Sequence, residues 1–260
     1  MKYPEVERLI EIVATLRGEN GCQWDREQTH KSLRPNMLEE AYEAVDAIDN
    51  ADVANLREEL GDVLLQVVLH SQIAKDNNEF DIEDVAKELG DKLIHRHPHV
   101  FAGKEVHSTQ EILNAWEELK KEEKTNRKSI LDGISKSQSA LMTAQKISKK
   151  VVKVGFEWDS INSLKKCIES EYKEFEEAVE LNDFDKMEDE MGDIFFATVN
   201  LARWYKIDAE QALLRANKKF TKRFKMMEEL AQKPLEDYSY EEFDSLWKKA
   251  KKITENRKLS

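Results

Sequence analysis

The sequence is poor in the residues that punctuate β-proteins and cross-link secreted ones. Its 260 residues include 8 glycines and 4 prolines, too few for the many turns of an all-β fold. The two cysteines, Cys22 and Cys167, fit no metal-binding spacing, so we interpret them as free thiols in a reducing cytosol. No apolar segment typical of a signal peptide follows the first residues. These absences predict a cytoplasmic protein.

Long hydrophobic runs and an excess of positive charge are lacking as well. The longest apolar stretch, Val63 to Leu69, is interrupted by Gln66 and falls far short of the roughly 20 residues that cross a bilayer. Asp and Glu number 53 against 41 Lys and Arg, which gives a net charge of −12. Because an acidic surface repels polyanions, we expect no membrane insertion and no nonspecific nucleic-acid binding. A polyphosphate could still bind through bridging metal ions.

What the chain does have is a repeated acidic pattern. Charged residues make up 36% of a sequence rich in helix-forming residue types. Four acids recur, each 131 residues after its counterpart: Glu40, Glu43, Glu59 and Asp62 become Glu171, Glu174, Glu190 and Asp193. We therefore predict an all-α tandem repeat of helical bundle modules. The N-terminal module covers residues 1–123, a linker covers 124–136, and the C-terminal module covers 137–260.

Helical periodicity predicts the elements of the first module. The expected helices cover residues 3–18, 37–50, 53–77, 82–97 and 108–124. Ser108 and Ser239, each followed three residues later by Glu, are typical of capping boxes. The helices over 37–50 and 53–77 are each apolar on one face and are joined by a short connection. We therefore expect these two helices to pack antiparallel.

The acids fall on these two neighbouring helices. Glu40 and Glu43 are three residues apart and share one helical face, as do Glu59 and Asp62 on the next helix. If the helices are antiparallel, the four carboxylates converge, and four close anions need a cation to stay ionised. Carboxylate oxygens favour Mg²⁺ or Mn²⁺. The competing interpretation is a solvated acidic helix face.

The motif Glu-Glu-x-x-Glu beginning at Glu39, followed by Glu-x-x-Asp beginning at Glu59, resembles the MazG family. The resemblance covers nearly the whole chain. It implies an all-α bundle that forms a homodimer and hydrolyses nucleoside triphosphates to nucleoside monophosphate and pyrophosphate, for nucleotide-pool control or sanitation. It also implies Mg²⁺ as the cofactor, with Mn²⁺ able to substitute. In the second copy of the motif, Ser170 replaces the leading Glu.

The resemblance further implies roles for individual residues. The metal and the catalysis in the C-terminal module would fall to Glu171, Glu174, Glu190 and Asp193. A second metal site would be formed by Glu40, Glu43, Glu59 and Asp62. The nucleotide would be bound by Lys186, Lys219, Arg223 and Trp247, and we add Lys222 as a candidate because it flanks the lysine and arginine on the same helix. From the residues alone, these cations also fit a basic surface near a helix C-terminus, and the tryptophan fits core packing.

The two modules differ at the candidate phosphate-binding positions. Our alignment sets Asn55, Leu93 and His97 against Lys186, Lys219 and Arg223. The N-terminal module would then lack three cations that could hold a triphosphate. We therefore expect the C-terminal module to be the main catalytic one, and the N-terminal module to keep a metal site or to serve assembly.

Other interpretations stay open at this point. The chain could be a related all-α pyrophosphatase of the dUTPase, dCTPase or phosphoribosyl-ATP type, with the same chemistry on another substrate. It could also be a non-enzymatic helical scaffold or regulator. A zinc site at His95, His97 and His99 is disfavoured, because Pro98 breaks the helix there and no cysteine lies near.

Overall fold

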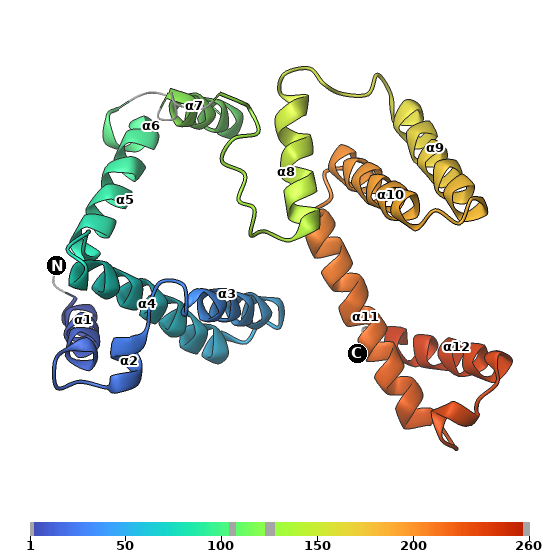
Figure 1. Ribbon diagram of the computed structural model, residues 1–260, viewed down its shortest axis with the longest axis horizontal. Coiled ribbons are helices and arrows are strands. Elements are labelled where there is room, and N and C mark those ends of the chain that lie inside the picture. Colours follow the sequence, from blue (N-terminus) through green and yellow to red (C-terminus); the bar gives the residue numbers. More distant parts are fainter. Residues whose placement is uncertain (1–2, 104–107, 123–127, 257–260) are drawn as a thin grey trace. The chain divides into compact units, whose positions relative to one another are not determined.

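The computed structural model describes residues 3–103, 108–122 and 128–256, and every regular element in these ranges is a helix. The chain divides into two compact units, residues 1–125 and 126–260. Figure 1 shows both units. The first contains α1 (Pro4–Arg17), α2 (Gln23–Glu27), α3 (Arg34–Asp49), α4 (Val53–Asp76), α5 (Ile82–Arg96), α6 (Pro98–Phe101) and α7 (Thr109–Glu122). The second contains α8 (Ala140–Val152), α9 (Ile161–Glu180), α10 (Phe184–Trp204), α11 (Ala209–Leu230), a short 3-10 turn, η1 (Leu235–Asp237), and α12 (Tyr240–Asn256).

The core of the first unit forms where α1 and the second half of α4 meet. Its buried side chains are Val13, Leu33, Val68, Leu69 and Ile73. Arg17 closes one side of this core, because its side chain is 7% exposed and its Nε lies 2.8 Å from a carboxylate oxygen of Asp76 on α4. The same guanidinium donates to the carbonyl oxygens of Asp25 and Gln28. One buried cation thus holds α1, α2 and α4 together.

A helical hairpin recurs in both units, as the sequence predicts. α3 packs on α4, and α9 packs on α10 (Figure 1). In each hairpin a residue with φ of +54° makes the turn: Ala51 in the first unit and Asn182 in the second. The next residue, Asp52 or Asp183, caps the following helix by accepting a hydrogen bond from the backbone N–H three residues later. The duplication therefore extends to the local turn geometry.

Buried polar side chains join α8 to the rest of the second unit. Ser148 Oγ donates to Asn200 Oδ1 at 2.5 Å, and Asn200 is 2% exposed. Gln145 donates to the carbonyl of Ile207 at 2.6 Å and accepts from the backbone N–H of Ala209 at 3.1 Å. Because every partner is matched, these contacts fix α8 against α10 and the start of α11 at little desolvation cost.

The expected all-α tandem fold is confirmed, and the five helices expected in the first module are found with small shifts at their ends. Residues 123–127, which include the end of the last expected helix and the start of the expected linker, lie outside the described residues. The sequence analysis missed the two short helices α2 and α6. The capping box at Ser239 is complete, because its backbone N–H donates to Glu242 at 2.8 Å and its Oγ accepts from the Glu242 N–H at 3.3 Å.

The apolar faces of the two hairpins are largely open to solvent. In α3 the buried positions are the small Ala44 and Ala47, whereas the larger apolar side chains point outward. The exposed large side chains on the hairpin helices include Leu38, Tyr42, Leu60, Tyr172, Phe184 and Phe195. None of the described helices combines the length and the apolar character that crossing a membrane requires.

Candidate metal centre

Each hairpin brings three glutamates together. In the second unit, α9 supplies Glu171 and Glu174, and α10 supplies Glu190. One carboxylate oxygen from each lies within 4.8 Å of the others. The first unit holds the same arrangement, formed by Glu40, Glu43 and Glu59. Within the described part of the chain, these are the two groups of side chains whose spacing could hold a metal ion.

Glu190 is the least exposed residue of the C-terminal trio. The residue is 9% exposed, and no hydrogen bond or ion pair to it is found among the described residues. Partial burial raises its pKa above the usual value, and the charge of Glu174 raises it further, while Lys186 opposes the shift. Three carboxylates at this spacing repel one another unless a cation neutralises them. The side chain therefore favours a cation beside it.

The carboxyl pKa values are raised in the first unit as well. Partial burial raises the pKa of Glu40, and the charges of Asp62 and Glu43 add to this effect. The pKa of Glu59 is also raised, first by burial and then by Glu43 and Asp62. Because three carboxylates crowd one another, each disfavours the ionised form of its neighbours. Both trios thus have the charge distribution of a cation site.

The fourth acid of each set lies outside the close group. Asp62 and Asp193 are one helical turn beyond Glu59 and Glu190, and their oxygens are not part of the two groups within 4.8 Å. Their charges still reach the trios, because Asp62 raises the pKa of Glu40 and Asp193 raises that of Glu190. The structure therefore brings three of the four expected ligands together and places the fourth nearby.

Two side chains that the sequence analysis did not assign to the site contact the acids. Cys167, one turn before Glu171 on α9, donates from Sγ to Glu171 Oε1 at 3.4 Å. Burial raises the pKa of this thiol, and the hydrogen bond to Glu171 adds to the shift. Ser170, which replaces the leading Glu of the motif, donates to Glu174 Oε1 at 3.2 Å. A helical spacing of four residues is the signal that could have found both contacts.

Among the expected nucleotide-binding residues, Lys186 has a charge that acts on one of the acids. It occupies the first turn of α10, and its charge lowers the pKa of Glu190. Lys219 and Lys222 are exposed on α11. Arg223 is 12% exposed in its side chain, forms a 2.7 Å ion pair with Glu255 on α12 and lies 5.9 Å from the ring centroid of Trp247.

Trp247 also packs inside the α11–α12 hairpin. Its ring centroid is 5.2 Å from that of Phe220, and it lies against the core cluster formed by Met226, Met227, Leu246 and Ala250. In this structure Arg223 and Trp247 therefore stabilise the hairpin. Their roles in nucleotide binding stay predictions.

The contact between Arg223 and Trp247 corrects our alignment of the modules. In the first unit the guanidinium of Arg96 lies 5.8 Å from the ring centroid of Trp116. Arg96 on α5 is therefore the spatial counterpart of Arg223, and His97 is not. The offset in this helix is 127 residues, which pairs Lys219 with Lys92. The N-terminal module thus has cations at two of the three positions where our sequence alignment had placed Leu93, His97 and Asn55.

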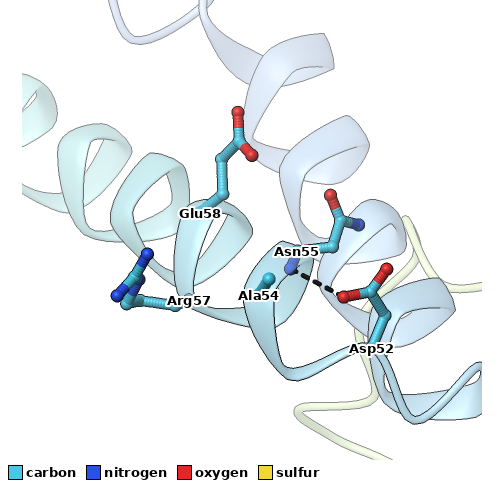
Figure 2. Close-up of a pocket in the computed structure, with 5 residues that line it drawn as sticks. All are labelled: Asp52, Ala54, Asn55, Arg57 and Glu58. Atoms are coloured by element: carbon cyan, nitrogen blue, oxygen red, sulfur yellow. Dashed lines mark hydrogen bonds between the residues drawn. The ribbon is translucent and has the colours of Figure 1, made fainter.

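Asn55 remains a true difference between the modules. Its backbone N–H bonds to the cap Asp52, as that of Lys186 bonds to Asp183, so the two side chains are equivalent. Asn55 lines a hollow of about 520 Å³ at the start of α4, together with Asp52, Ala54, Arg57 and Glu58. Figure 2 shows the Arg57 side chain directed away from Asp52 and Asn55. Arg57 is a cation at the rim of this hollow that the sequence analysis did not consider.

The histidine segment forms no third metal group among the described residues. The Nδ1 atom of His97 lies 2.7 Å from the carbonyl oxygen of Leu93, which its N–H can satisfy. The rings of His97 and His99 are 5.7 Å apart and tilted by 54°. The helix ends at Arg96, just before Pro98, as the sequence predicts.

Comparison with known proteins places both acid sets inside one family pattern. The model of the MazG nucleotide pyrophosphohydrolase domain matches residues 28–101 and again residues 159–227. The chain is 45% identical over 249 residues to the nucleoside triphosphate pyrophosphohydrolase/pyrophosphatase MazG of Thermotoga maritima, covering 94% of this chain and 95% of that protein. It is 42% identical over 259 residues to the nucleoside triphosphate pyrophosphohydrolase of Escherichia coli K12, covering 95% and 97%. A crystal structure of a mazG-related protein from Thermotoga maritima shares 32% identity and a TM-score of 0.39, covering 44% of this chain and 98% of that one.

Proposed function

The chain belongs to the MazG nucleotide pyrophosphohydrolase family, and from this membership we propose that it hydrolyses nucleoside triphosphates to nucleoside monophosphate and pyrophosphate. The observation that carries the proposal is the convergence of three glutamates from α9 and α10, of which Glu190 is 9% exposed. A solvated acidic helix face needs no convergence, whereas here one oxygen from each glutamate lies within 4.8 Å of the others although the three side chains come from two helices. The interpretation of these acids as a solvated helix face therefore fits the structure less well than a cation site does.

The acids fit a hard divalent cation, and we propose Mg²⁺, with Mn²⁺ able to substitute. In the C-terminal module it would be held by Glu171, Glu174, Glu190 and Asp193. In the N-terminal module it would be held by Glu40, Glu43, Glu59 and Asp62. When bound, the ion supplies Lewis-acid stabilisation of charge on the phosphate oxygens.

The remaining chemistry falls to side chains of the hairpin. Glu171 or Glu174 on α9 serves as the general base that takes the proton from the attacking water. Ser170 limits the orientations of Glu174 through its hydrogen bond. Attack on the α-phosphorus expels pyrophosphate, whose charge needs a nearby cation. Lys186 fills this role best, because its charge already acts on Glu190.

We propose that the active form is a homodimer. The outward apolar side chains of α3, α4, α9 and α10 need cover, since soluble monomers rarely expose large contiguous apolar surfaces. A second copy of the chain would bury equivalent faces against one another, as symmetric dimers do.

The direct test is product analysis in water enriched in ¹⁸O. The protein is incubated with each of the common ribo- and deoxyribonucleoside triphosphates and Mg²⁺. We expect nucleoside monophosphate and pyrophosphate, with the label in the monophosphate because water attacks the α-phosphorus. Nucleoside diphosphate with orthophosphate would overturn the proposed reaction. Preference for one base would indicate a specialised pyrophosphatase such as a dUTPase or dCTPase.

Metal dependence is tested on the same preparation. We expect activity to vanish in excess EDTA and to return with Mg²⁺ or Mn²⁺. Full activity after rigorous chelation would exclude a metal role for the acids. A folded protein that binds Mg²⁺ and nucleotide by calorimetry, yet hydrolyses nothing, would favour the scaffold interpretation.

A further inference from the structure

The C-terminal acid trio has a thiol at its edge. Cys167 is half-buried and free, and its Sγ contacts Glu171 Oε1 at 3.4 Å. The spacing of Cys167, Glu171 and Glu174 along α9 puts all three side chains on one face of the helix. Sulfur is a soft donor, whereas every other candidate ligand in this group is a hard carboxylate oxygen.

The separation of sulfur and oxygen suits a shared cation. Zinc binds thiolate sulfur at roughly 2.3 Å and carboxylate oxygen at roughly 2.0–2.2 Å, so a tetrahedral ion holding both would place them roughly 3.6 Å apart. The observed distance is 3.4 Å. An ion could therefore occupy both donors with little movement of α9, because sulfur and oxygen already stand at ligand spacing.

A second observation points independently to a cation at this place. Glu190 is 9% exposed and directed into the trio, and no hydrogen bond or ion pair to it is found among the described residues. The thiol lies outside the group within 4.8 Å, so it would reach an ion from the Glu171 side. Glu171 would then be the ligand common to the thiol and the trio.

The N-terminal module lacks this soft donor. The residue 131 positions before Cys167 is Asn36, while Glu40, Glu43 and Glu59 repeat the trio. An amide oxygen is a hard donor and adds no preference for soft ions. The two modules therefore provide an internal comparison in which the carboxylates are matched and the thiol differs.

We propose that Cys167 makes the C-terminal acid centre a high-affinity site for thiophilic divalent cations of the Zn²⁺ and Cd²⁺ class, which inhibit by occupying Glu171. The proposal rests on the proposed function for the location of the catalytic centre. On binding, the S–H bond breaks, a sulfur–metal bond forms and the proton leaves to solvent, with no change of oxidation state. The ion would compete with Mg²⁺ for Glu171 and keep it from its role in the reaction.

The test is a Cd²⁺ titration of the full-length, freshly reduced protein in chelator-free buffer. The readouts are the ultraviolet thiolate-to-cadmium charge-transfer absorption and calorimetry. We expect one charge-transfer site in the natural protein and in Cys22→Ser, whose substituted thiol is exposed. Cys167→Ser and Cys167→Asn should lose the absorption and bind Cd²⁺ at least about ten-fold more weakly. Asn36→Cys should add a second site.

The inhibition arm uses Mg²⁺-supported hydrolysis. Cd²⁺ or Zn²⁺ should inhibit the natural protein at concentrations about ten-fold lower than it inhibits Cys167→Ser. Retention of the absorption in Cys167→Ser, its loss in Cys22→Ser, or equal Cd²⁺ affinity with and without the thiol would overturn the proposal. The absorption and calorimetry do not depend on catalysis. Absent hydrolysis with an intact cadmium site would therefore count against the proposed function alone.

Discussion

At the scale of single residues, Glu190 couples protonation to folding. Its raised pKa means that the folded protein, without metal, binds the proton more tightly than the unfolded chain does. The resulting stabilisation is fully present below the ordinary pKa of about 4.5 and is lost as the pH rises through the raised value. At neutral pH the ionised side chain therefore opposes folding until a cation neutralises it.

We predict that Glu190→Gln stabilises the protein without metal and destabilises it relative to the natural protein when Mg²⁺ is bound. In EDTA above the raised pKa, the variant should melt at a higher temperature than the natural protein, because glutamine removes a crowded charge. Below about pH 4.5 the difference should disappear. With excess Mg²⁺ at neutral pH the natural protein should be the more stable. Thermal melts over pH, with and without Mg²⁺, measure this, and a variant less stable in EDTA at pH 8 would contradict it.

At the scale of helices, periodicity made most of the fold predictable. The hairpin of α3 and α4 was predictable because both helices are long and their join is short. The helices α2 and α6 were not, since they have 5 and 4 residues and so contain too few turns to show a period. The exposure of side chains such as Tyr42 could not be predicted from the sequence either, because a periodic pattern identifies an apolar face without showing what covers it.

The candidate site was predictable in its acids and less so in its cations. Spacing of three residues on a helix puts Glu171 and Glu174 together whatever surrounds them. Assigning Arg223 to His97 failed because the polar end of a helix offers no apolar anchor for alignment, and a shift of one residue rotates the assignment by about 100°. The contact of Arg96 with Trp116 supplied the anchor that the sequence lacked.

We predict that Trp247 stabilises the C-terminal hairpin independently of substrate. Trp247→Ala should reduce the free energy of unfolding by about 3 kcal/mol, the low end for a tryptophan, because the ring is half-buried. Trp247→Phe should restore much of it by keeping a ring against Phe220. Urea unfolding without nucleotide measures both. If Trp247→Ala unfolds like the natural protein but has a raised KM, the residue serves nucleotide binding alone.

At the scale of the whole molecule, the proposed assembly is argued from the apolar side chains that α3, α4, α9 and α10 expose. We predict a homodimer by sedimentation at micromolar concentration. Phe195→Glu should weaken it at least about ten-fold, because Phe195 is 58% exposed on α10 and a charge there cannot be buried without a partner. Tyr240→Glu, at an 82% exposed aromatic residue that begins α12, is the control. A natural protein that sediments as a fully active monomer would exclude this assembly.

The two modules also bear on how activity is divided within one chain. The two modules differ in fewer phosphate-binding cations than the sequence alignment indicated. Arg96 of the N-terminal module matches Arg223 of the C-terminal module, and Lys92 matches Lys219. What remains at the hairpin is Lys186 in the C-terminal module against the neutral Asn55. Losing one charge-assisted contact costs roughly 1.5–3 kcal/mol, which corresponds to roughly ten- to a hundred-fold in rate or binding.

We therefore predict unequal sites whose inequality depends on one residue pair. Glu190→Ala should remove most activity and Glu59→Ala should leave most of it, while Lys186→Asn should lower kcat/KM by roughly ten- to a hundred-fold. Adding Asn55→Lys to Glu190→Ala should then raise the residual activity, because the N-terminal acids would gain the cation that they lack. Circular dichroism and thermal melts check that each variant is folded. If folded Glu59→Ala is as inactive as Glu190→Ala, both trios take part in catalysis. Lys186 then does not make the C-terminal site more active than the N-terminal one.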